Sequence, residues 1–476
     1  MRKIAIVGGG ISGLATAFYL QEYALRPLDI TLIERAPRLG GKIASAQESG
    51  FVVEGGPDSF LTRKPSALAL CRHLGLNDDL IGCNDSKKTT YVWSGGQLHP
   101  LPEGMMLMAP TMALPFLRSR LISWTGKARM GMEALLPQRR ANDDESLAGF
   151  VRRRLGQEAL DKIAAPLMAG IFAADPERLS MQSAFPIFLE MERKHGGLLR
   201  AILRQKRAQQ RSPVGPGPEN ASRSMFMTLR GGLQQLVDAI AARLHPQTVL
   251  LDRHALGVAR VHERYRILLN DGSALYADEI VFATPSYVTA DLIREIDPAL
   301  ALKLRGIRHV STATVSLGFH SRDIARPLDG SGFVVPRNEN RQITACSWSS
   351  TKFNHRAPER CALLRVFVGG ARAEALAEQD GAALVDLARR ELRAILGITA
   401  TPVLAKAYRW RKGNPQYDVG HQARIAEIDE IVAWHPGLHL AGAAYHGAGI
   451  PDCIDDAVKV ARFIAQKTGA SREMAV

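Results

Sequence analysis

The chain has few cysteines and no long apolar run, and each shortage excludes a class of protein. Its five cysteines among 476 residues include no CxxC pair. This argues against a zinc site or a disulfide framework and favours a reducing compartment. No run reaches the roughly 20 apolar residues that a membrane-spanning helix needs. We therefore expect a cytoplasmic protein without a membrane span.

Acidic residues are also in short supply. The chain has 61 Lys and Arg against 47 Asp and Glu, which gives a formal net charge of +14. Such a charge suits nucleic acid, anionic lipid or a polyanionic small molecule. No nucleic-acid-binding motif accompanies the basic runs at 152–154 and 204–211, so we expect no nucleic-acid partner. The composition leaves the oligomeric state open.

The most informative pattern lies at the N-terminus. A short apolar strand leads into a glycine turn, a helical stretch, a second apolar strand and then Glu34. In such a turn Gly8 permits the tight bend, Gly10 lets the backbone approach a pyrophosphate, and Gly13 lets the helix pack closely on the sheet. The N–H groups that open the helix favour an anion. Glu34 comes where a carboxylate accepts hydrogen bonds from a ribose. The pattern predicts a bound adenine dinucleotide.

Periodicity and turn residues divide the rest of the chain. Helical spacing dominates after about residue 98, and residues 205–224 contain three prolines and almost no apolar side chains. Strand patterns return near 225, with a hairpin signal at 270–272. We expect a first nucleotide-binding part (1–95), a helical subdomain (96–204), a flexible linker (205–224), a second nucleotide-binding part (225–289), a substrate-binding domain (290–414) and a third nucleotide-binding part (415–476).

This order predicts an α/β fold. The nucleotide-binding domain is Rossmann-like and discontinuous, and an α+β substrate domain and a helical subdomain are inserted into it. The most apolar stretch, 105–117, contains two prolines and has two interpretations. It is either a buried or lid segment, or an apolar surface that touches a bilayer or frames the entrance for an apolar substrate.

Four further segments resemble the FAD-dependent porphyrinogen oxidases of the flavin amine-oxidase superfamily. They are GPDSF at 56–60, PLMAGIFAADP at 166–176 with Leu179-Ser180 after it, PQYDVGH at 415–421 and GIPDCID at 449–455. They look most like the soluble branch from Gram-positive-type bacteria, whose members oxidise coproporphyrinogen III. The resemblance implies non-covalent FAD, a porphyrinogen substrate in haem biosynthesis, and oxygen as the acceptor with release of hydrogen peroxide.

The resemblance also assigns residues by position. Those expected to contact FAD are Gly8, Gly10, Ile11, Ser12, Gly13, Glu34, Arg35, Gly41, Lys42, Gly56, Pro57, Asp58, Ser59, Val258, Gly442, Gly449, Ile450 and Pro451. Those expected near the substrate are Arg63, Lys64, Gly170, Phe172, Arg409 and Tyr417. Arginine suits the propionates of a porphyrinogen because its fork binds both carboxylate oxygens. We assign no catalytic acid, base or metal ligand, because the flavin carries the chemistry.

Four other residues near these motifs also have expected roles. The family often has glycine where Ala174 stands, and the added methyl group either narrows the substrate pocket or fixes its loop. His421 and His446 are expected to form hydrogen bonds rather than to shuttle protons. Cys453 is not expected to attach the flavin covalently.

Several alternatives stay open. Oxidation of protoporphyrinogen IX, the reaction of the mitochondrial and plastid branch, is the nearest. Amine oxidases surround the flavin with an aromatic cage, but only 6% of this chain is aromatic. A carotenoid desaturase is a further alternative. A non-catalytic lipid-binding protein of the same fold should lack the glycine motif and Glu34, and its purified form would not be yellow. Contact with the membrane surface also remains open.

Overall fold

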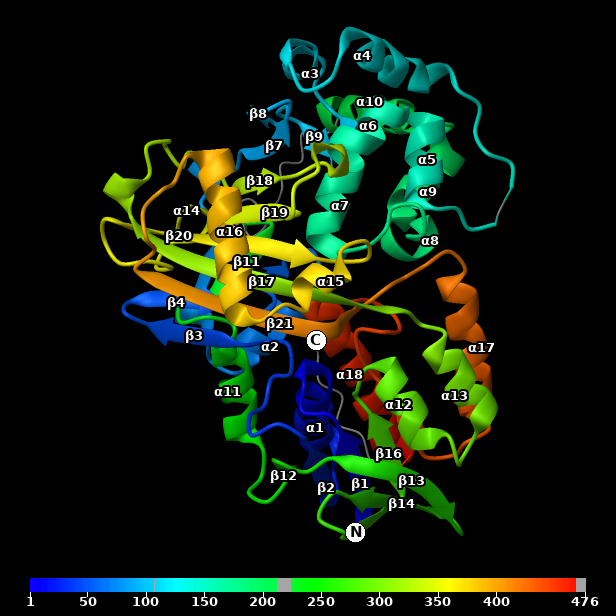
Figure 1. The fold of residues 1–476 in the computed structure, drawn as a ribbon. Coiled ribbons are helices and arrows are strands. Elements are labelled where there is room, and N and C mark those ends of the chain that lie inside the picture. Colours follow the sequence, from blue (N-terminus) through cyan, green and yellow to red (C-terminus); the bar gives the residue numbers. More distant parts are fainter. Residues whose placement is uncertain (107, 142, 212–223, 468–476) are drawn as a thin grey trace.

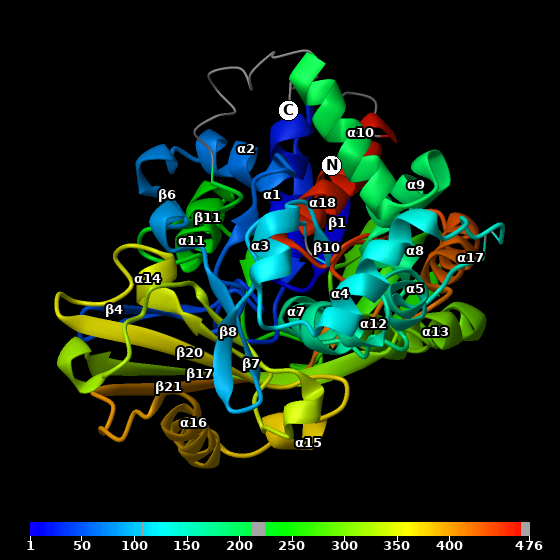
Figure 2. The same cartoon turned by 90° about the horizontal axis from the view of Figure 1, so that it is seen from above.

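The computed structural model describes residues 1–106, 108–141, 143–211 and 224–467. In Figure 1 segments coloured blue, green and red meet in the lower part of the molecule. A large sheet lies above them on one side, and a group of helices lies above them on the other. Figure 2 shows the same arrangement from above. The nucleotide-binding fold is therefore assembled from distant parts of the chain, as predicted.

The lower part is built on a five-stranded parallel sheet. Its spatial order is β12 (Val249–Leu250), β2 (Leu28–Ile33), β1 (Arg2–Val7), β16 (Glu279–Phe282) and β22 (Leu438–Leu440). Ala5 at the centre of β1 pairs with Thr31 on one side and Ile280 on the other. The strands are rich in Ile, Leu and Val because parallel sheets are buried on both faces.

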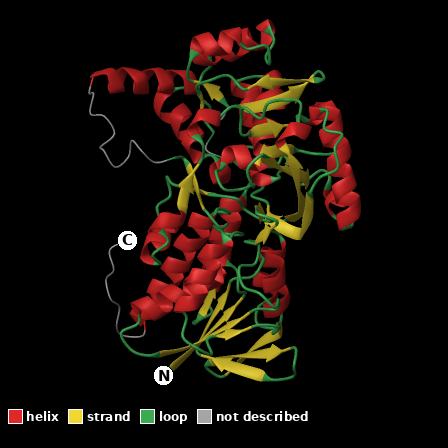
Figure 3. Ribbon diagram, turned by 90° about the vertical axis from the view of Figure 1, so that its left-hand side faces the viewer, coloured by secondary structure: helices red, strands yellow, loops and turns green. Residues whose placement is uncertain are grey.

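Helices cover one face of this sheet (Figure 3). Helix α1 (Ile11–Tyr23) packs against α18 (Ile450–Lys467), with α11 (Gln234–Arg243) and α2 (Ser66–His73) beside them. Near the other face lie α12 (Ser286–Ile293), α13 (Pro298–Arg305), α17 (His421–Ala433) and an antiparallel sheet of β13 (Ala255–Val261), β14 (Arg264–Leu269) and β15 (Ala274–Ala277). The turn between β14 and β15 is the hairpin that the 270–272 pattern predicted.

The substrate-side sheet has seven strands. Their order is β21 (Leu404–Pro415), β17 (His309–His320), β20 (Cys361–Gly369), β19 (Ala345–Trp348), β18 (Gly332–Val334), β7 (Thr90–Ser94) and β8 (Gln97–Pro100). Helices α15 (Glu374–Ala377) and α16 (Gly381–Leu396) pack on it, and the Asp380 side chain caps α16. Strand β7 pairs with β18. The expected end of the first nucleotide-binding part at residue 95 is therefore too late by one strand.

Short strands join the two main parts. β3 (Ser45–Glu48) and β4 (Phe51–Glu54) form a hairpin against β17 and β21, and Phe51 packs on Leu404. A second small sheet pairs β5 (Phe60–Leu61) and β6 (Leu80–Gly82) with β11 (Phe226–Leu229). These strands flank the 55–59 turn, which therefore lies where the nucleotide-binding and substrate-side parts meet.

The helical subdomain contains α3 (Ala113–Arg118), α4 (Trp124–Gly131), α5 (Leu147–Arg154), α6 (Gln157–Ala159), α7 (Ala165–Phe172), α8 (Met181–Ala184), α9 (Pro186–His195) and α10 (Leu198–Arg211). Helix α10 extends beyond 204, so the predicted linker is wrong for 205–211, where helical bonding continues. Residues 212–223 of that segment lie outside the described residues. None of the helices in the described ranges is long and apolar enough to cross a membrane.

The apolar stretch at 105–117 is divided between the interior and the surface. It forms a hairpin of β9 (Met105–Met106) and β10 (Ala109–Pro110) and then α3. Met108 and Phe116 are buried, whereas Met112, Leu114 and Leu117 are exposed. The segment is therefore partly buried and partly exposed, and contact of its exposed side chains with a bilayer or with the substrate stays a prediction.

Candidate active site

The glycine turn between β1 and α1 leaves space at one position only. A Cβ atom on Gly8 would lie 2.8 Å from the Ala283 carbonyl oxygen, and one on Gly13 would lie 1.9 Å from that of Gly8. A Cβ on Gly10 would meet no described atom within 4 Å. The turn is therefore closed by its own backbone but open beside Gly10. This is the shape that a passing pyrophosphate requires.

The acid after β2 braces this turn. The Glu34 carboxylate accepts hydrogen bonds from the backbone N–H groups of Gly9, at 2.6 Å, and Ala36, at 2.8 Å. Each carboxylate oxygen has a further lone pair for a ribose hydroxyl. Arg35 beside it is exposed. The predicted adenosine contacts of both residues remain predictions.

Ile11 and Ser12 open α1, and Gly442 follows β22 close to them. A Cβ on Gly442 would lie 3.6 Å from the Ser12 hydroxyl oxygen. Val258 is buried in β13. Because β13 is an edge strand of its sheet, part of its backbone is not used by sheet pairing, as an adenine contact would need.

A second glycine loop lies against the first. Gly41 has a φ of +56° and packs on Gly10. Lys42 donates a hydrogen bond to the Gly413 carbonyl oxygen at 2.7 Å, and burial lowers its pKa. A Cβ on Gly56 would lie only 1.8 Å from the Lys42 carbonyl oxygen. The predicted residues 41–42 and 56–59 are thus brought together.

The Gly56 to Ser59 turn, which includes Pro57, is held by buried charges. Asp58 accepts hydrogen bonds from Lys352 at 2.9 Å and from the Ser59 hydroxyl at 2.7 Å. Burial opposes ionisation of Asp58, but Lys352 and Arg365 outweigh it and lower the pKa of the carboxyl group. Asp58 is therefore an ionised anchor of the turn.

Residues of the substrate-side sheet that hold this turn by hydrogen bonds were not predicted from the sequence. Trp410 and Thr314 each donate a hydrogen bond to the Gly55 carbonyl oxygen at 2.8 Å. The Tyr408 ring stacks on Trp410 and would clash with a Cβ on Gly55. Arg365 donates to the Gly55 carbonyl oxygen at 3.3 Å. An arginine inside the apolar strand 362–368 was the available signal, because such a residue is buried only when it has partners.

The start of α18 completes this region. Gly449 donates its N–H to the Asp452 carboxylate at 3.2 Å, and Ile450 and Pro451 are buried in the first turn. Lys64, predicted to meet substrate, forms an ion pair with Asp452. The N-terminus of a helix favours nearby negative charge. Burial raises the pKa of the Cys453 thiol to about 11, so this thiol is a poor nucleophile.

Arg409 lies on the face of β21 that is turned away from the Gly55 turn. Side chains alternate between the two faces of a strand. Tyr408 and Trp410 of β21 face Gly55, so Arg409 points to the opposite face. It donates to the Gln379 carbonyl oxygen at 3.4 Å, at the end of the loop before α16. Its predicted contact with the substrate stays a prediction.

Tyr417 is buried and its hydroxyl donates to the Ala443 carbonyl oxygen at 2.7 Å. Its ring stacks on His421 at 4.3 Å. Burial raises the pKa of Tyr417 and lowers that of His421. His446 is paired with Asp456 at 3.2 Å, and this hydrogen bond raises its pKa. These groups connect the helical subdomain to the turn before α18, and all three are engaged in structural contacts.

The last turn of α7 carries the other predicted contacts, Gly170 and Phe172, and the loop after it begins at Ala173. A Cβ on Gly170 would meet open space, and Phe172 packs edge-on against Phe185 at 5.5 Å. Ala173, with a φ of +51°, adopts the left-handed conformation, whereas Ala174 does not. Alanine at position 174 is therefore free of backbone strain in this loop.

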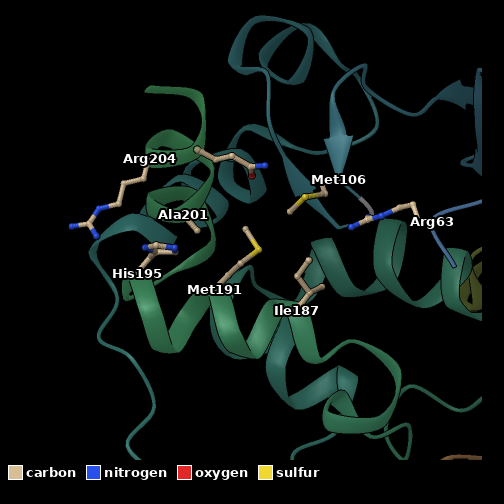
Figure 4. Close-up of a pocket in the computed structure, with 8 residues that line it drawn as sticks. Arg63, Met106, Ile187, Met191, His195, Ala201 and Arg204 are labelled. Carbon is tan, nitrogen blue, oxygen red and sulfur yellow. The ribbon is translucent and has the colours of Figure 1, made fainter. Parts of the chain in front are cut away.

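A cavity of about 440 Å³ lies between α9, α10, β9 and the loop after β5. Figure 4 shows the Arg63 side chain at one end, beside Met106, with Ile187 and Met191 along the wall and His195 at the other end. Arg63 is exposed and precedes Lys64, the residue paired with the first turn of α18. One end of this largely apolar cavity is therefore next to the candidate flavin site.

Comparison with known proteins agrees with this geometry. A family model described as flavin containing amine oxidoreductase matches residues 11–465. The coproporphyrinogen III oxidase of Bacillus subtilis is 37% identical over 460 residues, 95% of this chain and 96% of that protein. The protoporphyrinogen oxidase of Bos taurus is 31% identical, over 95% of this chain and 96% of that protein.

A crystal structure from Exiguobacterium sp., provisionally described as a protoporphyrinogen oxidase, is also similar. It is 33% identical, with a TM-score of 0.86, over 98% of this chain and 99% of that chain. The chain thus has the fold and the dinucleotide turn of a flavin-dependent oxidoreductase. It belongs to the flavin-containing amine oxidoreductase family, and its cofactor is FAD.

Proposed function

We propose that this enzyme oxidises coproporphyrinogen III to coproporphyrin III, with oxygen as the acceptor and hydrogen peroxide as the second product. The observation that carries the proposal is the cavity whose apolar wall ends at Arg63, the residue before Lys64, which pairs with Asp452 at the start of α18. A porphyrinogen is an apolar macrocycle with carboxylate arms, so it needs an apolar wall with a cation at the rim. The similarity to coproporphyrinogen III oxidases supports the same substrate.

The chain's own residues bind and orient rather than exchange protons. When bound, the flavin accepts the electrons that the substrate loses. Met106, Ile187 and Met191 offer an apolar surface to the ring system, and Arg63 offers two parallel N–H groups to a propionate. His421 and His446 are held by Tyr445 and Asp456. They therefore serve the turn before α18 rather than the reaction.

Substrate preference tests the proposal directly. Coproporphyrinogen III has four propionates, whereas protoporphyrinogen IX has two propionates and two vinyl groups. We expect a higher kcat/KM for coproporphyrinogen III at low salt. Added salt should reduce the preference because it screens the extra carboxylates. Porphyrin fluorescence with each substrate in parallel measures both effects. Equal or faster turnover of protoporphyrinogen IX would assign the chain to the protoporphyrinogen oxidases instead.

Arg63→Ala should raise KM more than about tenfold and leave kcat nearly unchanged, because a charge-assisted hydrogen bond contributes roughly 1.5–3 kcal/mol. Flavin absorbance should stay at one FAD per chain. Lys64→Ala is the matched control: it removes the neighbouring cation, which is paired with Asp452 rather than free. A larger KM effect for Lys64→Ala than for Arg63→Ala would reverse the two assignments.

We also propose that the enzyme contacts anionic membrane lipid peripherally. Helix α3 exposes Met112, at its N-terminal cap, with Leu114 and Leu117. Exposed Arg118 follows them, and Lys206 of α10 donates to the Thr111 carbonyl oxygen. Apolar side chains surrounded by cations suit the interface of an anionic bilayer.

The membrane proposal predicts that the enzyme co-sediments with phosphatidylglycerol vesicles and much less with phosphatidylcholine vesicles. Leu114→Glu should abolish this binding because it places an anion in the apolar patch. Leu302→Glu, on an exposed side chain of α13 outside the patch, should not change it. Binding that survives Leu114→Glu would exclude this face.

A further inference from the structure

A second cavity, of about 420 Å³, lies at the end of the substrate-side sheet. Its walls come from the loop before β7, the loop after β17, the start of β20, and α14 (Ser349–Lys352) with the loop that follows it. In Figures 1 and 2, α14 lies on the other side of the molecule from α9 and α10, which line the cavity that contains Arg63. The two cavities are therefore separate.

The lining of this second cavity is basic. Lys87, Arg326, His355 and Arg356 contribute to it, and none of the described residues that line it is Asp or Glu. Serine, threonine and asparagine side chains supply further hydrogen-bonding groups, such as Asn354. A hollow that combines several cations with neutral donors and has no carboxylate favours a ligand with more than one negative charge.

The cations differ in how far the protein already uses them. Arg356 is fully engaged at the back of the cavity, where it donates to the Arg230 carbonyl oxygen at 3.1 Å and to the Thr228 hydroxyl at 2.8 Å. Glu54 lies 3.5 Å away from it. Lys87 and Arg326, in contrast, have no ion pair with any residue in the described part of the chain.

The carboxylates close to the cavity already interact with other residues. Asp329 accepts a hydrogen bond from the Tyr91 hydroxyl at 2.8 Å, and Asp323 lies 3.9 Å from Arg322. The Arg326 guanidinium lies 5.1 Å from the centre of the Tyr91 ring and forms a hydrogen bond with the Tyr91 hydroxyl, which together hold the side chain in place. A guanidinium has five N–H donors, so it can also donate to a ligand. Thus the Arg326 side chain is already held in position, and the exposed Lys87 side chain is free to contact the ligand.

We propose that this cavity binds a small metabolite with at least two phosphate or carboxylate groups, and that Lys87 and Arg326 are its main ligands. The ligand's remaining atoms lie against Ile324 and Leu328, which supply an apolar side to the cavity. The proposal depends on these residues alone and does not require the porphyrinogen assignment.

Isothermal titration calorimetry on the FAD-loaded enzyme tests this, with inorganic pyrophosphate and citrate as separate probes. At least one probe should bind at a single site, and the probe that binds more tightly identifies phosphate or carboxylate as the preferred group. Lys87→Gln and Arg326→Gln should each weaken binding more than about tenfold, since each removes a charge-assisted contact. Arg322→Gln is the control: its exposed side chain is nearby but outside the lining. No binding of either probe, or equal weakening by the control, would overturn the proposal.

Cysteine labelling gives a second readout that needs no variant. Cys361 lines this cavity and is partly exposed, whereas Cys71, Cys346 and Cys453 are buried. Alkylation of Cys361, followed by peptide mass spectrometry, should slow several-fold when the tighter probe is present. An unchanged Cys361 rate at saturating probe would place the binding elsewhere and refute the site.

Discussion

Gly10→Val should give a folded protein that purifies without FAD. The protein leaves room for a valine side chain at this position, because a Cβ atom would meet no described atom within 4 Å. The backbone φ of −73° is also one that valine adopts readily. The side chain would instead occupy the path of the pyrophosphate. A loss of about 4 kcal/mol of binding free energy lowers the affinity for FAD roughly a thousandfold. This is enough for FAD to be lost during purification.

Two measurements separate this effect from misfolding. The ratio of flavin to protein absorbance should fall to near zero for Gly10→Val, while the far-ultraviolet circular dichroism spectrum stays like that of wild type. Gly131→Val is the matched control, because a Cβ at Gly131 at the end of α4 also meets open space but lies in the helical subdomain. A Gly10→Val protein with full flavin content would refute the assignment of this turn to the cofactor.

The part of the site that could be predicted is the part encoded locally. Gly8, Gly10, Gly13 and Glu34 lie within one strand–helix–strand unit, so their spacing alone indicates their arrangement. The hairpin at 270–272 was predictable for the same reason. Such patterns record backbone requirements that hold wherever the unit is placed in the fold.

The part that could not be predicted depends on long-range packing. Alternation along β21 separates Arg409 from Tyr408 and Trp410, but only the pairing of β21 with β17 shows which face meets Gly55. The face of β21 on which Arg409 lies could not be predicted for this reason. The ion pair between Asp58 and Lys352 joins residues far apart in sequence, and no local pattern announces it.

The helical subdomain depends on a buried ion pair that was also not predicted from the sequence. Glu133 and Arg154 are both fully buried, and the Arg154 Nε donates to Glu133 at 2.9 Å. The same carboxylate accepts the backbone N–H groups of Leu198 and Leu199 at 2.7 and 3.0 Å, so it caps α10. One side chain therefore compensates a buried guanidinium and begins a helix.

Glu133→Ala should destabilise this subdomain by about 3–5 kcal/mol. Within the described part of the chain, it leaves the buried, charged Arg154 with only one carboxylate nearby, that of Glu192 at 3.5 Å, which Arg153 already pairs with. Thermal unfolding followed by circular dichroism should show an earlier transition, and hydrogen exchange should become faster in α5 and α10. Glu177→Ala removes the partner of Arg152 in an exposed pair and should cost at most about 1 kcal/mol. Adding Arg154→Met to Glu133→Ala should recover part of the loss, since the poorly compensated buried charge is then gone. Recovery will be incomplete because α10 still lacks its cap. If Glu133→Ala and Glu177→Ala unfold alike, the buried pair does not hold the subdomain together.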